Sequence, residues 1–234
     1  MLELKNIYKY YNPGTVNEMC LFKGFNLTVK DGEFLSVVGS NGSGKTSMLN
    51  IICGSIPVES GNILLDGRDI TNAKEFKRNE KIGRVYQNPS LGTCPSMTIL
   101  ENMALADNKG KPFNLLPGTN RQRIDFYREQ LKSLGLGLED KLHVKVGVLS
   151  GGQRQAMALL MSTMTPIEFL ILDEHTAALD PATADKVMEI TRSIVSENHL
   201  TTLMITHNLS QALTTGNRTI MLDKNLINII LGNI

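Results

Sequence analysis

Long hydrophobic runs, paired cysteines and net charge are scarce in this sequence. No stretch of its 234 residues approaches the roughly 20 consecutive apolar residues that a membrane-spanning helix needs. The three cysteines, Cys20, Cys53 and Cys94, are odd in number and form no Cys-x-x-Cys pair. Their spacing excludes a disulfide framework and a cysteine-based metal site, and it favours a reducing cytosol.

The formal net charge is only +1, which argues against a nucleic-acid footprint or an anionic membrane surface. Residues 1–6 carry charges where a secretory signal needs an apolar run, so we expect no signal peptide. Hydrophobic residues make up 41% and charged residues 20% of the chain, as in a globular protein with a large core. If the protein serves a membrane, another chain has to cross it.

The strongest motif is rich in glycine and reads Gly39-Ser40-Asn41-Gly42-Ser43-Gly44-Lys45-Thr46-Ser47. Apolar residues 34–38 precede it and an apolar segment closed by Gly54 follows it, which predicts a strand, a tight loop and a helix. In this setting the pattern G-x-x-x-x-G-K-[ST] is a P-loop, whose inward-pointing N–H groups hold phosphates at a helix N-terminus. We expect Lys45 to reach the terminal phosphates of a nucleotide and the Thr46 hydroxyl to ligate Mg²⁺.

Residues 1–36 alternate apolar and polar positions between turn signals and predict a β-rich lead-in. Tyr8, Tyr10 and Tyr11 lie within it. Two interpretations have equal weight: the rings alternate in burial along a strand, or one of them stacks on a nucleotide base. Tyr11, at the end of the strand, is the best candidate for stacking.

The next segments alternate in type. Strands are predicted at 61–67 and 82–86, with a polar helix at 72–80 between them, and Gln87 closes the second strand. Strand ends are where ligands bind in α/β nucleotide folds, so Gln87 is a candidate site residue. Residues 88–164 have methionine-rich helical periodicity at 97–107, 121–134 and 150–163, and a long loop at 107–120. They predict a helical insert whose methionines either pack in a core or form an adaptable contact surface.

Residues 169–172 form a continuous apolar run that predicts a fully buried parallel strand. Asp173 and Glu174 follow directly, and two carboxylates at such a strand end are costly unless they meet a cation. Asp173 is therefore a candidate Mg²⁺ ligand, and Glu174 a candidate to orient or deprotonate an attacking water.

Asp180 precedes Pro181 and predicts the N-cap of a helix over 182–198. His207 ends the next buried strand, at 200–206, and is a functional candidate. The remaining histidines, His143, His175 and His199, have no such placement, and we expect structural or surface positions for them.

Leu149-Ser150-Gly151-Gly152-Gln153, together with the P-loop and the acidic strand end at 170–174, resembles the nucleotide-binding subunit of ABC transporters. The shared motifs run from Tyr11 to His207. The resemblance implies an α/β fold: a P-loop NTPase (RecA-like) core with an N-terminal antiparallel β subdomain and an inserted helical subdomain. Residues 1–234 would form a single ABC ATPase domain. Within it, 1–87 and 165–234 would form the lead-in and core, and 88–164 the helical subdomain.

The resemblance also implies a role for each site residue. Tyr11 stacks on the adenine of ATP, Gln87 touches Mg²⁺ and the attacking water, Glu174 is the catalytic base, and His207 senses the γ-phosphate. Ser150, Gly151 and Gly152, in the motif that Gln153 closes, contact the γ-phosphate, and Asp180 communicates across a dimer.

The Ser150 motif adds a second anion site at a helix N-terminus, held away from the P-loop of its own chain. Each ATP is therefore expected between the P-loop of one protomer and the Ser150 motif of another, in a two-fold homodimer that ATP closes and hydrolysis opens. The resemblance further implies a membrane permease, an extracytoplasmic solute-binding protein, a location at the cytoplasmic face of the cell membrane, and no nucleic-acid partner.

Several positions depart from the commonest family pattern. His175 replaces a proline, residues 157–161 replace an arginine-containing segment, the loop at 107–120 is long, and Asn225 replaces a turn glycine. With these features the chain resembles a bacterial group of uptake ATPases for amino-acid-like solutes, aromatic amino acids among them. The chain stops soon after 231, and a natural and a truncated end both stay open.

Two alternatives stay open beside uptake. One is an ABC ATPase without transport, acting in DNA repair, chromosome handling or translation. The single P-loop, the lack of heptads and the lack of Cys-x-x-Cys pairs argue against it. The other is a mechanical regulator of a membrane protein.

Overall fold

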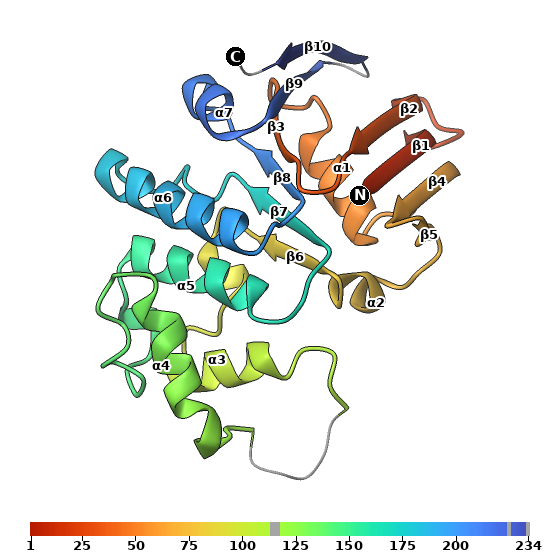
Figure 1. Ribbon diagram of the computed structural model, residues 1–234. Helices are drawn as coiled ribbons and strands as arrows, with labels where there is room; N and C mark the ends of the chain where they lie inside the picture. Colours follow the sequence, from red (N-terminus) through yellow and green to blue (C-terminus); the bar gives the residue numbers. More distant parts are fainter. Residues whose placement is uncertain (113–117, 224–225, 233–234) are drawn as a thin grey trace. The chain divides into compact units, whose positions relative to one another are not determined.

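The computed structural model describes residues 1–112 and 118–223 and the backbone of 226–232 (Figure 1). It forms two compact units. Unit 1 contains residues 1–82, 167–174 and 199–234, and unit 2 contains 83–166 and 175–198. The sequence instead assigned residues 83–87, 165–166 and 175–198 to the core, and that division stays a prediction.

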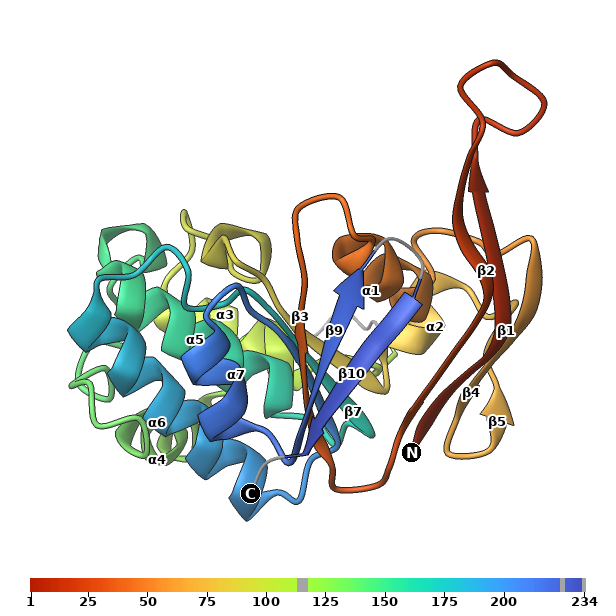
Figure 2. The same ribbon diagram turned by 90° about the horizontal axis from the view of Figure 1, so that it is seen from above.

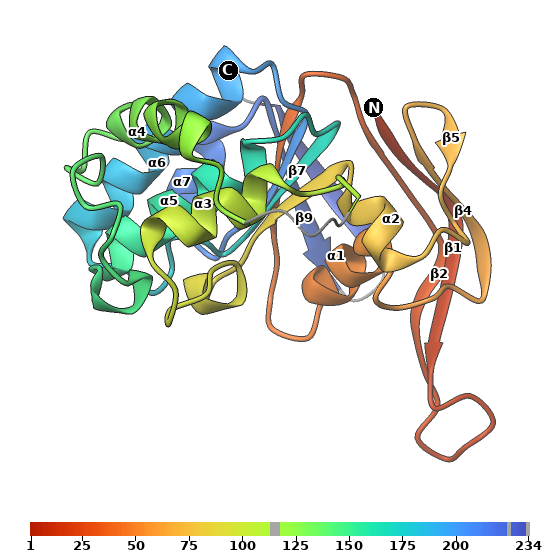
Figure 3. The same cartoon turned by 90° about the horizontal axis from the view of Figure 1, so that it is seen from below.

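One sheet of unit 1 is antiparallel, in the order β2-β1-β4-β5. Its strands are β1 (Leu2–Tyr11), β2 (Met19–Val29), β4 (Ser60–Leu65) and β5 (Arg68–Asp69). Strand β1 pairs with both β2 and β4, with register shifts between Leu4 and Tyr10. Figures 2 and 3 both show the β1–β2 connection extending away from the rest of this unit. This is the β-rich lead-in that the alternating residues predicted.

The second sheet has the order β10-β9-β3-β8-β7-β6. Its strands are β3 (Phe34–Val38), β6 (Ile82–Val85), β7 (Phe169–Asp173), β8 (Thr202–Ile205), β9 (Arg218–Asp223) and β10 (Leu226–Gly232). Strand β3 is parallel to β8 and β9, and β7 is parallel to β8. Because parallel strands end at one edge of a sheet, the segments that follow β3, β7 and β8 meet there.

Helix α1 (Lys45–Cys53) is buried along most of its length. Leu49 and Ile52 are fully buried in a hydrophobic cluster that includes Leu4 of the antiparallel sheet and Leu35 of the parallel sheet. Helix α7 (Leu209–Thr215) packs on β3 and β9, and the short α2 (Glu75–Asn79) contacts α1 (Figure 3). The P-loop helix is thus held by apolar side chains from both sheets.

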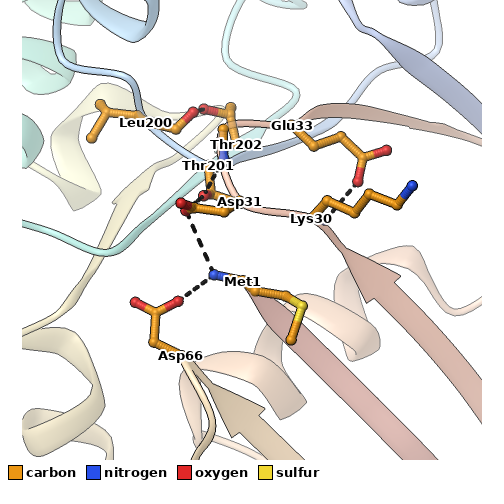
Figure 4. Close-up of polar contacts among 9 residues, drawn as sticks. Met1, Lys30, Asp31, Glu33, Asp66, Leu200, Thr201 and Thr202 are labelled. Atoms are coloured by element: carbon orange, nitrogen blue, oxygen red, sulfur yellow. Dashed lines mark hydrogen bonds and ion pairs between the residues drawn. The ribbon is translucent and has the colours of Figure 1, made fainter.

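The turn between β2 and β3 is joined to the start of β8 by polar contacts (Figure 4). The Thr201 hydroxyl donates to Asp31 Oδ1 at 3.1 Å and accepts from the Gly32 amide at 3.0 Å. The amino group of Met1 contacts Asp66 and lies 3.8 Å from Asp31. These contacts fix the chain where it enters the central strand β3.

Unit 2 is helical. It contains α3 (Ile99–Asp107), α4 (Ile124–Lys132), α5 (Gly151–Thr163) and α6 (Pro181–Glu197), with the 3₁₀ turns η1 (Pro89–Leu91), η2 (Arg121–Arg123) and η3 (Val146–Val148). The described part of 88–164 has no strand, only one isolated bridge between Thr98 and Lys145. Met103 and Met157 are fully buried, so these methionines pack in a core.

Two predicted helices are shorter than expected. The helix at 72–80 is reduced to α2, and the helix at 121–134 begins as η2, which the Asn120 side chain caps through Gln122 N. A 3₁₀ turn of this kind is frequent at the start of an α-helix. Asn225, and part of the loop at 107–120, lie outside the described residues. Among the described helices, none is long and apolar enough to span a bilayer.

Arg78 closes the C-terminus of the P-loop helix. Its guanidinium donates to Ile51 O, Ile52 O, Thr71 O and Ala73 O over 2.7–3.0 Å, and the residue is only 4% exposed. We expect Arg78→Ala to lower the free energy of unfolding by about 3 kcal/mol, because it leaves buried carbonyl groups without donors. Urea unfolding measures this. Arg68→Ala, at an exposed position, is the control and should change stability by less than about 0.5 kcal/mol. Equal losses in the two variants would contradict a capping role.

Candidate active site

The glycine-rich loop lies between β3 and α1, as its flanking residues predicted. Gly44 has φ 96° and stands at the N-cap of α1. A Cβ on Gly39 would lie 2.3 Å from Leu222 O, so only glycine fits there. The Lys45 ammonium donates to Gly39 O at 2.7 Å and to Ser40 O at 2.9 Å. The loop is therefore wrapped around its own lysine, which is the closed shape that a phosphate cradle needs.

Two carboxylates lie near this lysine. Burial lowers the pKa of Lys45, and the negative charges of Glu174 and Asp173 oppose that shift. Asp173 ends β7 and Glu174 follows it, in the sheet that also contains β3, so the three charged groups share one sheet edge. Opposite charges at that edge suit a site that binds a polyphosphate together with a cation.

Glu174 and His207 are in direct contact. His207 Nε2 lies 2.7 Å from Glu174 Oε1, and the Glu174 amide donates to Ile205 O at 3.0 Å. Glu174 has φ 48°, an uncommon backbone conformation for a residue with a side chain, and such strain gathers at functional sites. In this geometry the Glu174 carboxylate can accept a proton, and the His207 imidazole can orient that carboxylate.

The donors offered to a metal are Asp173 and Thr46. Both are hard oxygen groups of the kind that Mg²⁺ prefers. Thr46 lies exposed in the first turn of α1, and Asp173 is half-buried. Within the described ranges no three acidic, histidine or cysteine groups gather into a metal cage. The residues fit Mg²⁺ that completes its shell with substrate phosphates and water, which is its usual mode with nucleotides.

Tyr11 stands beside the P-loop helix. Its hydroxyl lies 3.1 Å from Ser47 Oγ, and the ammonium of Lys9 lies 5.7 Å from its ring centroid. Lys9 is buried and is held by Pro57 O and Glu59 Oε1, each at 2.8 Å. The half-buried ring is thus fixed next to the phosphate cradle. Neither Lys9 nor Glu59 was identified from the sequence, because their pairing joins residues 50 positions apart in the chain.

The Ser150 motif opens helix α5 in unit 2. The Ser150 side chain accepts from Gln153 N at 3.2 Å, and Gln153 Oε1 accepts from Ser150 N at 3.2 Å, which forms a capping box. A Cβ on Gly152 would lie 2.2 Å from Thr183 Cγ2 of α6, while Gly151 follows the cap. A pocket of about 350 Å³ adjoins this start, lined in part by Leu136, Thr183 and Lys186.

Asp180 caps α6, as its position before Pro181 predicted. Its carboxylate accepts from Thr183 N at 3.1 Å. His175 is buried, and its Nε2 lies 3.2 Å from Thr191 Oγ1. Burial lowers the pKa of His175 to about 4, so the ring is neutral at physiological pH. This confirms a structural position for His175.

Gln87 is exposed, two residues after β6. Directly before it, Tyr86 O accepts a hydrogen bond of 3.0 Å from Nε2 of the buried Gln155. Sequence reasoning did not identify Gln155, because a glutamine within a helix gives no sign of its burial.

The structure gathers the P-loop (39–47), Tyr11, Asp173, Glu174 and His207 in unit 1. It places Gln87, Ser150, Gly151, Gly152, Gln153 and Asp180 in unit 2. The role assigned to each of them stays a prediction.

Comparisons with known proteins agree with the motifs. A family model described as ABC transporter matches residues 22–177. A tyrosine transport ATP-binding protein of Clostridioides difficile (strain R20291) is 48% identical over 224 residues, which cover 96% of this chain and 89% of the relative. The spermidine/putrescine import ATP-binding protein PotA of Haemophilus ducreyi (strain 35000HP / ATCC 700724) is 33% identical over 95% of this chain and 56% of that protein.

Among solved structures, a dimeric post-hydrolysis state of the ATP-binding cassette MJ0796, bound to ADP and Pi, superposes with a TM-score of 0.83 at 30% identity. It covers 100% of this chain and 99% of that chain. This confirms the fold class expected from the sequence. Since the family model extends over the P-loop, the Ser150 motif and the acidic strand end, the chain belongs to the ABC transporter family as an ATP-binding subunit, an ATPase that couples ATP hydrolysis to transport.

Proposed function

We propose that this subunit powers the import of amino-acid-like solutes, with aromatic amino acids such as tyrosine as the solute class. The observation that carries the proposal is the 48% identity to a tyrosine transport ATP-binding protein over 96% of the chain. An ATP-binding subunit does not itself contact the solute. The proposal therefore includes a membrane permease, an extracytoplasmic solute-binding protein, and a position at the cytoplasmic face of the membrane.

The proposed chemistry is in-line attack of water on the γ-phosphorus of ATP, which breaks the bond to the bridging oxygen and releases ADP and phosphate. Glu174 accepts the proton of the attacking water, and its contact with His207 supports this role. Lys45 and the P-loop amides bind the phosphates, and Tyr11 stacks on the adenine. Held by Thr46 and Asp173, with Gln87 as a further contact, Mg²⁺ would neutralise phosphate charge.

The second half of the proposed site comes from another copy of the chain. Ser150, Gly151 and Gly152, next to Gln153, contact the γ-phosphate bound to the partner, and Asp180 lies at the dimer contact. The dimeric MJ0796 cassette supports pairing of two copies. ATP closes the pair and hydrolysis opens it, so the permease receives one movement for each cycle.

Transport by the reconstituted complex tests the solute class. With the permease and the solute-binding protein in vesicles, we expect ATP-dependent uptake of labelled tyrosine and no uptake of spermidine. Spermidine is the informative comparison because a polyamine import protein is also a relative. Vesicles that contain the Glu174→Gln variant control for leakage. Uptake of spermidine but not of tyrosine would overturn the solute assignment and leave the ATPase assignment intact.

A further inference from the structure

Gln155 is a polar side chain in an apolar environment. It lies in α5, one turn after Gly152, and is only 1% exposed. Its neighbours along the helix, Ala156 and Met157, are fully buried. A buried amide is costly unless it is hydrogen-bonded. The donor group of Gln155 finds its partner outside the helix, at Tyr86 O, 3.0 Å away.

This hydrogen bond fixes the peptide that leads into Gln87. The Tyr86 carbonyl and the Gln87 amide share one planar peptide unit, so holding the carbonyl oxygen also sets the orientation of the Gln87 backbone. The Tyr86 ring is held as well, because the Arg84 guanidinium carbon lies 4.7 Å from its centroid. The exposed Gln87 side chain therefore projects from a backbone with a defined direction.

The chain is also fixed directly after Gln87. Asn88 Oδ1 accepts from Ser90 N at 3.0 Å and caps η1, and the Thr93 hydroxyl donates to Pro89 O at 2.9 Å. Turn η1 packs against α5, the helix that contains Gln155. Both sides of Gln87 are thus connected to one helix, which begins at the Ser150 motif.

We infer that Gln155 is a positioning residue for Gln87 and couples it to the helix of the Ser150 motif. This inference rests on the proposed role of Gln87 in hydrolysis. Since Gln155 lies one turn after Gly152 in α5, a displacement of the helix start reaches the Gln87 backbone through Gln155. Because Gln155 is buried, the role assigned to it is to position Gln87 and not to contact ATP or the metal ion.

The test replaces Gln155 with methionine, which has a similar length and no amide. With the full chain and Mg-ATP, kcat should fall about tenfold, the effect of one lost hydrogen bond in a positioned group. The Kd of ATP in EDTA should not change. Amide exchange of the 86–92 segment, measured without nucleotide, should become faster.

Thr163→Val is the matched control, since it removes hydrogen bonds to Leu159 O and Leu160 O from the same helix. In this control, kcat and the amide exchange of the 86–92 segment should both stay as in the unchanged protein.

A double-mutant cycle with Gln87→Ala separates positioning from a general structural effect. If Gln155 acts through Gln87, adding Gln155→Met to Gln87→Ala should reduce kcat no further. Additive losses, or exchange at 86–92 that matches the Thr163→Val variant, would overturn the inference. Gln155→Leu repeats the measurement if methionine lowers the melting temperature more than the control does.

The cycle also separates this inference from the proposed function. A normal kcat in Gln87→Ala alone would remove Gln87 from the mechanism, and the inference would fail with it. A low kcat in Gln87→Ala together with a normal kcat in Gln155→Met would overturn only the role of Gln155.

Discussion

Replacing Glu174 with glutamine should reduce ATP hydrolysis by at least ~10²-fold, the range for loss of a general base. Glutamine keeps the size of the side chain but cannot accept the proton of the attacking water. Nucleotide binding should persist, because the P-loop and Tyr11 are unchanged. ATP should therefore hold the variant as a closed dimer. Phosphate release measures the rate, and size-exclusion chromatography with ATP measures the dimer.

Glu168→Gln is the matched control. Glu168 directly precedes the same strand, β7, at the opposite end from Glu174, and pairs with Lys81 at 3.2 Å. It should hydrolyse ATP at the normal rate. Normal turnover in Glu174→Gln would remove Glu174 from the proposed mechanism, and a monomer in the presence of ATP would contradict the proposed closure.

The second large effect is expected in the P-loop, at the lysine predicted to hold the terminal phosphates of ATP. Lys45→Ala should weaken ATP binding about 10- to 100-fold, because a charge-assisted contact to phosphate is worth roughly 1.5–3 kcal/mol. The variant also loses the two hydrogen bonds from Lys45 to Gly39 O and Ser40 O that hold the empty loop. Titration calorimetry with ATP measures the change in Kd.

Two comparisons make the Lys45 experiment specific. Lys23→Ala, at an exposed position in β2, removes one positive charge and should bind ATP normally. Adenosine has no phosphate, so its weaker binding should not respond to the loss of Lys45. An unchanged Kd for ATP in Lys45→Ala would argue against the phosphate role of Lys45. It would not affect the catalytic role proposed for Glu174.

Helix α5 shows how far the sequence analysis could reach. Ser150 and Gln153 stand three residues apart, and this spacing alone predicts the capping box that the structure contains. Gln155 lies two residues further on and has no such local partner. Its partner, Tyr86, is 69 positions away. The periodicity of residues along the chain does not reveal contacts between segments so distant.

The same limit applies to Tyr11 and Arg78. The end of a strand made Tyr11 a stacking candidate, with burial as an equal alternative. Only the tertiary structure shows that Ser47 and Lys9 lie beside the ring, and stacking on adenine stays a prediction. Arg78 lies in a polar stretch, where an arginine is usually solvated. Only the packing of α2 on α1 shows that it caps a helix of which it is not a part.

The sequence by itself determined the family, the P-loop, the acidic strand end and the place of His207. These are local patterns, in which glycine conformation, strand burial and charge follow from neighbouring residues. Tertiary structure decided which side chains meet: His207 with Glu174, Lys9 with Glu59, and Gln155 with Tyr86. The physical reason is that hydrogen bonds and ion pairs depend on distances of about 3 Å between groups, and only the packing of distant segments sets those distances.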